Sequence, residues 1–340
     1  MDAAPRGELH RAEASRTLKV CAVTNVRSIR NAVSFAVAAE QKGFWGVAVI
    51  DTAPRLFQAV YPAVTACLMS TNTVRVATHV TNVVSQHWSV HASTARALEE
   101  LAPGRFILGL ATGDGAVRSV GLVPASWPSV QSDVLALREE APANLEIQIA
   151  ASGPRGAAVA GAVGTELITG TGLDIPALRY LGDIADDAAD RSGRNRPGKW
   201  MTVVLCLVDR EGDAEAARSY VRGVAVSIAH FALGQHFEGK NVPERWRRVL
   251  RERLSNYDYR HHGAEGATSN ATMFEDLPEL ERYLVDRMVV VGTIEQCRER
   301  LLTVVREAGI DGLHVATFGP LGPPHAIELL DRVAAVVLPT

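Results

Sequence analysis

The feature that most constrains this chain is a regular alternation of short apolar runs with helical patterns, which begins at Thr17 and continues toward the C-terminus. Eight runs rich in β-branched and other apolar residues have the length and composition of strands. They are Leu18–Val23, Gly46–Ile50, Val74–Val80, Arg105–Leu110, Leu145–Ala150, Glu166–Thr169, Met201–Val208 and Gly312–Thr317. Strands that are apolar along their whole length are typical of a parallel sheet buried on both faces.

Amphipathic segments lie between these runs and predict the covering helices. They are Ser28–Lys42, Leu56–Ser70, Trp88–Leu101, Ser129–Glu140, Arg155–Val163, Pro176–Arg191, Ala214–Leu233 and Ile294–Ala308. Eight strand–helix units in 340 residues predict an α/β fold, a closed (β/α)8 TIM barrel with insertions. The alternative is an open doubly wound sheet, but the GxGxxG motif expected after its first strand is absent.

Two segments depart from this rhythm. Residues 1–16 are polar with mixed charge, and they predict a disordered arm before a single domain over residues 17–340. The second is an insertion at about 235–280, which contains the run from Tyr257 to His262. A long excursion from a compact domain is usually a lid over a site or an interaction arm.

Composition excludes several classes of function. The net charge of −3 offers no basis for nucleic-acid binding. No apolar run approaches the ~20 residues of a membrane span, and the N-terminal residues lack the apolar core of a signal peptide, so we expect a cytoplasmic protein. The four cysteines and the His261-His262 pair lack metal-ligand spacing, which predicts no metal site. The cysteines are Cys21, Cys67, Cys206 and Cys297.

Polar residues gather directly after the predicted strands. Asp51 ends the second strand, His79 lies near the end of the third, and Thr112-Gly113-Asp114 follows the fourth. The carboxyl ends of barrel strands form one face, so these side chains are candidates for a shared site with a small-molecule substrate. As alternatives, Asp51 caps a loop, Asp114 is a solvated turn residue, and His79 is a core histidine bonded to a backbone carbonyl.

The fifth predicted strand runs into a small, glycine-containing loop that opens a helix. This loop contains Ala151, Ser152, Gly153 and Pro154. A helix N-terminus offers free backbone N–H groups and a favourable dipole, so the loop is a candidate phosphate site.

Two motifs carry a resemblance to a known family. Residues 77–82 read ATHVTN, and residues 104–121 read GRFILGLATGDGAVRSVG. They resemble the GTGVTN and GRxxLGxGTGDSAVRxxG runs of the bacterial luciferase-like flavin-dependent oxidoreductases. The similar branch includes methylene-tetrahydromethanopterin reductase and other enzymes of the deazaflavin coenzyme F420. The resemblance extends from about Leu18 to the C-terminus. Within it, Thr293 is the expected N-cap of a helix.

The resemblance implies roles for particular residues. Asp51 lies at the cofactor, and a non-prolyl cis peptide between His79 and Val80 supports the back of the flavin ring. Asn82 and Asp114 lie at the ring edge, because an amide can pair with a pyrimidine-type ring and Asp114 can act as a general acid. The implied cofactor-binding residues are Asp51, His79, Val80, Asn82, Thr112, Gly113, Asp114, Ala151, Ser152, Gly153, Pro154, Gly170, Thr171 and Gly172.

Three functions stay open at this point. The first is hydride transfer from reduced F420 to a small unsaturated or imine-like substrate, with Asp114, His79 and Asp51 as catalytic candidates. The second is a monooxygenase that reacts reduced flavin mononucleotide (FMN) with oxygen. The third is an inactive barrel that serves as a binding or assembly subunit, because Thr52 and Gln86 replace a histidine and an arginine that are usual in the family. The resemblance also implies a homodimer.

Overall fold

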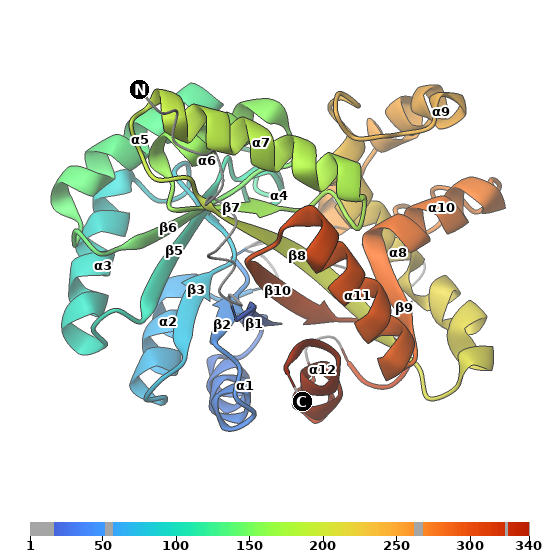
Figure 1. Cartoon of the computed structure of the whole chain (residues 1–340), viewed down its shortest axis with the longest axis horizontal. Helices are drawn as coiled ribbons and strands as arrows, with labels where there is room; N and C mark the ends of the chain where they lie inside the picture. Colours follow the sequence, from blue (N-terminus) through green and yellow to red (C-terminus); the bar gives the residue numbers. More distant parts are fainter. Residues whose placement is uncertain (1–16, 52–56, 262–267, 324–325, 340) are drawn as a thin grey trace, which may run out of the picture.

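A computed structural model describes residues 17–51, 57–261, 268–323 and 326–339 of the chain (Figure 1). The predicted arm over residues 1–16, as well as Thr52 and His262, lies outside the described residues. Eight parallel strands form the barrel. They are β1 (Lys19–Thr24), β2 (Gly46–Val49), β3 (Arg75–Thr78), β5 (Phe106–Ala111), β6 (Glu146–Ala150), β7 (Glu166–Thr169), β8 (Gly198–Leu207) and β10 (Gly312–Thr317).

Strand β10 closes the barrel. It pairs with β1, where Lys19 lies opposite Gly312, and with β8, where Gly312 lies opposite Trp200. The remaining barrel strands pair in sequence order. The predicted closed barrel is therefore confirmed, each of the eight predicted strands is present, and the alternative of an open sheet is wrong.

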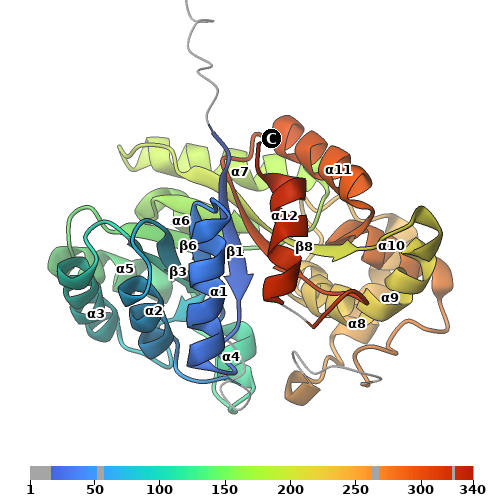
Figure 2. The same cartoon turned by 90° about the horizontal axis from the view of Figure 1, so that it is seen from below.

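Helices surround the barrel (Figures 1 and 2). The α-helices that accompany its strands are α1 (Ile29–Gln41), α2 (Val60–Met69), α3 (Trp88–Leu101), α4 (Asp114–Arg118), α5 (Trp127–Glu140), α6 (Pro154–Val163), α7 (Ile175–Arg191), α8 (Ala214–Leu233), α11 (Ile294–Ala308) and α12 (Leu330–Val337). Helices α8 and α11 have the predicted bounds, and Thr293 caps α11 in a capping box with Gln296. Helix α2 begins later than predicted, because the N–H of Gln58 donates to Val26 and holds that residue in the loop.

Between α8 and the end of the barrel the chain makes an excursion. It forms α9 (Glu244–Leu254), the 3₁₀ turn η2 (Tyr259–His261), α10 (Pro278–Met288) and strand β9 (Val289–Gly292). Strand β9 pairs with Val204–Leu207 of β8, past the β8 residues that pair with β7. In Figures 1 and 2 these elements lie beside α8, on the side of the barrel away from α2 and α3.

The core has two parts because successive strand residues point to opposite faces of the barrel wall. In β1, Val20 and Ala22 face the helices, whereas Cys21 and Val23 belong to a second cluster, which extends from the barrel interior to α8 and α10. Trp200 is the largest side chain of the interior and is fully buried. Among the described residues, no helix combines the length and apolarity needed to cross a membrane.

The third predicted strand is interrupted at its carboxyl end. Strand β3 ends at Thr78 and pairing resumes in β4 (Thr81–Asn82). Ala77 lies opposite Ile107 and Thr81 opposite Leu110, so β3 and β4 carry one residue more than the facing stretch of β5, as in a β-bulge. The peptide between His79 and Val80 within this bulge is cis, which confirms the prediction from the family resemblance.

Gly109 of β5 allows this bulge to lie close to the next strand. A Cβ atom at Gly109 would lie 2.1 Å from the backbone oxygen of Thr78, far inside van der Waals contact. The hydroxyl of Thr78 also donates to the Gly109 carbonyl and accepts from its N–H, at 2.9 Å each. Only glycine therefore fits between β3 and β5 without moving the backbone.

We expect Gly109→Ala to destabilise the barrel by about 1–3 kcal/mol or more, the usual cost of overpacking. The measurement is the midpoint of urea unfolding followed by circular dichroism. Gly212→Ala is the matched control, since a Cβ there has no neighbour within 4 Å. Equal midpoints for the two variants would show that the bulge accommodates the methyl group.

Candidate active site

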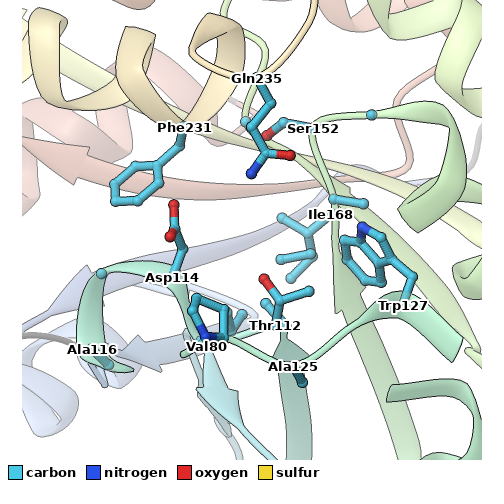
Figure 3. Close-up of a pocket in the computed structure, with 18 of the residues that line it drawn as sticks. Val80, Thr112, Asp114, Ala116, Ala125, Trp127, Ser152, Ile168, Phe231 and Gln235 are labelled. Carbon is cyan, nitrogen blue, oxygen red and sulfur yellow. The ribbon is translucent and has the colours of Figure 1, made fainter. Parts of the chain in front are cut away.

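One cavity of about 590 Å³ opens at the carboxyl ends of the barrel strands (Figure 3). Its lining comes from the segments that follow β2, β3, β5, β6 and β7, and from the end of α8 and the residues after it. Most of the predicted site residues contribute to this lining. They are Asp51, His79, Val80, Thr112, Gly113, Asp114, Ala151, Ser152, Gly153 and Gly170.

Asn82 lies outside the cavity lining, although the sequence predicted it at the ring edge. The residue is buried, and its side-chain oxygen accepts from the N–H of Val84 at 3.0 Å and of Ser85 at 2.8 Å. Its carbonyl accepts from His91 Nε2 at 3.1 Å. Asn82 thus stabilises the turn after the bulge, and nothing in this arrangement turns its amide toward a ligand.

Three further predicted residues lie outside the lining. Pro154 is the first residue of α6, between the lining residues Gly153 and Arg155. Thr171 and Gly172 instead pack against the C-terminal end of α10: the Thr171 carbonyl accepts from Arg287 Nε at 3.4 Å, and a Cβ at Gly172 would meet the Arg287 carbonyl at 2.3 Å. The predicted second wall of the phosphate site is therefore Gly170 without its two neighbours.

The cavity also contains residues that the sequence did not identify. Trp127 forms one wall, and Thr202 contributes from β8. The segment that begins at the end of α8 adds Phe231, Gln235, His236 and Lys240. The only sequence signal for these last residues was the position of the insertion near residue 235, which predicted a lid or an interaction arm but no particular side chain.

The lining residue His79 stacks on His314, which is buried beneath it and does not line the cavity. The rings of His79 and His314 lie 4.4 Å apart at 27°, and His79 Nε2 contacts the Thr202 hydroxyl at 3.3 Å. Gln148 donates through Nε2 to Glu166, so its oxygen accepts from His314 Nε2 at 3.0 Å. His314 is fully buried, and burial lowers its pKa well below the usual value, which keeps this ring neutral.

Asp51 contributes a carboxyl group to the cavity lining. Its Oδ2 is buried and has no hydrogen-bond partner among the described residues. Burial raises the pKa of the Asp51 carboxyl, because the ionised form loses hydration. Because Asp51 lines the cavity, a ligand there with an N–H or O–H group can meet its carboxyl group.

Asp114 begins α4 directly after Gly113, whose φ of 87° turns the chain from β5 into the helix. Its carboxylate accepts a hydrogen bond from Nε of Arg118, one turn later, and the hydroxyl of Tyr259 lies 3.4 Å from the same oxygen. In Figure 3 the side chains of Asp114 and Gln235 face the same open space from opposite walls. Asp114 is thus an acid that a bound ligand can reach.

The far end of the cavity is suited to an anion. Helix α6 begins after Gly153 without a side-chain cap, and Pro154 has no N–H, so the N–H groups of Arg155 and Gly156 are those its first turn offers a ligand. His236 lies against this turn, since a Cβ at Gly153 would meet its Nε2 at 2.5 Å.

The side chain of Lys240 adds positive charge near this turn, beside His236. Lys240 lines the cavity, is only 2% exposed and donates to the Ala232 carbonyl. Burial, and then the charge of Arg287, lower the pKa of Lys240 to about 8. Burial also lowers the pKa of His236, and the charges of Lys240 and Arg155 act in the same direction. The positive charges of Lys240 and Arg155 repel a proton on His236. A phosphate bound between these side chains would offset that repulsion.

The fold and the cavity define a (β/α)8 barrel with its ligand site at the carboxyl ends of the strands, where enzymes of this fold carry their active sites. The family model described as luciferase-like monooxygenase matches residues 9–131 and 124–312. The chain therefore belongs to the luciferase-like monooxygenase family, whose members are oxidoreductases and monooxygenases that use a flavin or F420. This confirms the predicted family and the predicted class of enzyme.

The similar proteins include one enzyme named as F420-dependent and another in complex with FMN. The 5,10-methylenetetrahydromethanopterin reductase of Methanolobus tindarius is 37% identical over 82 residues, which span 24% of this chain and 24% of that protein. The structure of coenzyme F420-dependent tetrahydromethanopterin reductase from Methanopyrus kandleri superposes with a TM-score of 0.71 at 13% identity, over 95% of this chain and 99% of that one. The oxygenating constituent of 3,6-diketocamphane monooxygenase from Pseudomonas putida, in complex with FMN, has a TM-score of 0.62 at 14% identity, over 95% and 99%. At these identities the two structures show the shared fold.

Proposed function

We propose that this protein transfers a hydride from reduced F420 to a small unsaturated or imine-like substrate. The observation that supports this most is that one cavity joins an acidic end, with Asp51 and Asp114, to an anion-binding end at the start of α6. A phosphate-bearing deazaflavin needs both ends, the first for its ring and the second for its phosphate. The segment shared with the methanopterin reductase of Methanolobus tindarius supports the choice of F420.

Each end of the cavity has a separate task in this proposal. The N–H groups at the start of α6, with His236 and Lys240, hold the phosphate, and Asp51 accepts from the ring edge. The His79–Val80 segment supports the back of the ring. When bound, the reduced cofactor supplies the hydride, and Asp114 supplies the proton that the reduced substrate requires. His79 is the alternative donor, because it also lines the cavity.

A second candidate is a monooxygenase that binds reduced FMN and reacts it with oxygen. The FMN complex of the diketocamphane monooxygenase, which shares the fold over 95% of this chain, favours this candidate. FMN also carries a phosphate, so the anion-binding end of the cavity suits both cofactors.

Anaerobic fluorescence titration of the protein with reduced F420 and with reduced FMN distinguishes the two candidates. The proposal expects tighter binding of reduced F420, followed by oxidation of the cofactor when a small enone or imine is added. Tighter binding of FMN, with oxygen consumption, would replace the proposal by the second candidate. Binding of neither cofactor would favour a barrel that acts as a binding or assembly subunit.

We also propose that the chain forms a homodimer through α2, α3 and α5. These neighbouring helices carry large apolar side chains that are 43–60% exposed. They are Met69, Val90, Leu101 and Leu135. Adjacent exposed apolar groups on helices suit a two-fold interface.

The expected mass by light scattering at micromolar concentration is twice the 36.5 kDa of one chain. Leu101→Lys should weaken the dimer. Tyr220→Lys is the control, because Tyr220 is 55% exposed on α8, outside the proposed interface. A strictly monomeric wild-type protein would contradict the proposal.

A further inference from the structure

A chain of three polar side chains connects the cavity to the excursion after α8. Asp114 lies on α4, Tyr259 on η2 and His230 on α8. The Tyr259 hydroxyl lies 3.4 Å from Oδ1 of Asp114 and 2.7 Å from Nε2 of His230. On its other side, His230 Nδ1 lies 3.1 Å from the Leu254 carbonyl.

These contacts determine how many protons the three groups can share. The Leu254 carbonyl only accepts, so His230 Nδ1 carries a hydrogen and Nε2 of the neutral ring is an acceptor. The single hydroxyl hydrogen of Tyr259 can then serve either His230 or an ionised Asp114, but not both. One additional proton completes both contacts, either on Asp114, which then donates to Tyr259, or on His230, which lets Tyr259 donate to Asp114.

We propose that Asp114, Tyr259 and His230 form a proton relay, which takes up one proton as a unit and delivers it from Asp114 into the cavity. The two loaded arrangements differ only by the shift of two protons along the chain, from His230 to Tyr259 and from Tyr259 to Asp114. Tyr259 and His230 are positioning and transfer groups outside the cavity lining. The relay gives a role, through Tyr259, to the Tyr257–Arg260 run, which the proposed function leaves unexplained.

The relay rests on the proposed function for its chemical step. The substrate would receive two electrons and one hydrogen, as a hydride, from the reduced cofactor, which would thereby be oxidised. The O–H bond of the Asp114 carboxyl breaks as a bond from hydrogen to the substrate heteroatom forms, which completes the two-electron reduction. A solvent proton then binds His230 at Nε2, His230 passes this proton to Tyr259, and Tyr259 passes its own proton to Asp114.

The surroundings of the relay support this direction of transfer. Arg118 bonds to Asp114 and lies 5.7 Å from the Tyr259 ring centre, so its positive charge stands at the delivery end of the relay. Burial raises the pKa of Tyr259, which keeps the phenol protonated, and burial lowers the pKa of His230, which favours release of its proton. The charge of Asp114 acts in the opposite direction on His230.

One aromatic neighbour, Tyr257, and one acidic neighbour, Asp258, complete this environment. Tyr257 stacks on the His230 ring at 4.1 Å and bonds through its hydroxyl to Ser227 at 2.9 Å. Asp258, the remaining acid of the run, is paired with Arg260 at 2.8 Å and contacts His261 at 3.2 Å. Neither Tyr257 nor Asp258 therefore replaces Tyr259 as the bridge to Asp114.

Nitrogen-15 NMR of labelled histidines tests the relay without any ligand. The readout is the pH midpoint at which His230 Nε2 becomes protonated, with the signal assigned by its loss in His230→Gln. We expect Asp114→Asn to lower this midpoint by about one pH unit, a tenfold change in proton affinity, because the protonated ring then loses its link to a carboxylate. We expect Tyr259→Phe to lower it by a similar amount and to remove most of the effect of Asp114→Asn in the double variant.

Tyr257→Phe is the matched control, since it removes a hydroxyl from the same run but keeps the ring on His230, and its midpoint should equal that of the wild type. A Tyr259→Phe midpoint equal to the wild-type value, or an undiminished effect of Asp114→Asn in the double variant, would overturn the relay. Reduced F420 should bind Tyr259→Phe within about twofold of the wild type, because Tyr259 does not line the cavity. If the His230 midpoint shifts in the variants as expected but the protein binds no F420, the proposed cofactor is refuted and the relay stands.

Discussion

Replacing Gly153 by aspartate is expected to abolish binding of the phosphate-bearing cofactor while the barrel still folds. The new carboxylate would stand at the start of α6, where the proposal places the phosphate. Two negative groups at about 4 Å repel strongly in a partly buried site, so affinity should fall about 100-fold or more. The fold should persist because aspartate is a favourable N-cap, and Gly153 has an extended backbone, with φ −155°, that any residue can adopt.

The measurement is fluorescence titration with reduced F420, together with the thermal unfolding curve. Gly153→Ala separates charge from size, since its methyl group meets only His236, the far end of a side chain that can move. Its affinity should fall much less than that of the aspartate variant. Wild-type affinity in Gly153→Asp would remove this loop from the phosphate site.

Replacing Asp114 by asparagine is expected to slow turnover more than it weakens cofactor binding. The amide has the shape of the carboxyl group but cannot supply an acidic proton, and general acid catalysis typically contributes ~10²–10⁴-fold to a rate. An interaction that acts in the transition state lowers kcat and kcat/KM together. Stopped-flow oxidation of reduced F420 by a small enone or imine measures the rate, and the titration described above measures the affinity.

Asp183→Asn is the control for this variant, because Asp183 is an exposed acid of α7 that does not line the cavity. It should turn over like the wild type. Full activity in Asp114→Asn would exclude Asp114 from catalysis and from the relay's delivery step, and it would leave His79 as the better proton donor.

Local signals in the sequence were sufficient for most of the scaffold. Apolar runs predicted each of the eight barrel strands, and the Thr293 cap predicted the start of α11. The family motif around residue 79 predicted the cis peptide between His79 and Val80. Such features depend on residues within a few positions of one another, so the sequence alone can specify them.

The sequence also predicted which strand ends would meet, and hence that Asp51, His79, Asp114 and Ser152 would line one cavity. It did not predict which way the side chains at those ends turn. Asn82 follows its strand as expected, but the turn over residues 82–85 uses its amide oxygen. Thr171 and Gly172 are likewise engaged by Arg287, from a helix that the periodic pattern did not include.

Only the tertiary structure determined the rest of the site. Tyr259 meets Asp114 across 145 positions of sequence, and His236, which follows α8, meets Gly153 at the start of α6. No period or cap encodes such contacts, because they depend on how the excursion after α8 packs against a closed barrel. The sequence by itself determined the barrel, its ligand-binding face and the acid at residue 114, whereas the packing of distant segments determined which groups hold an anion and which contact that acid.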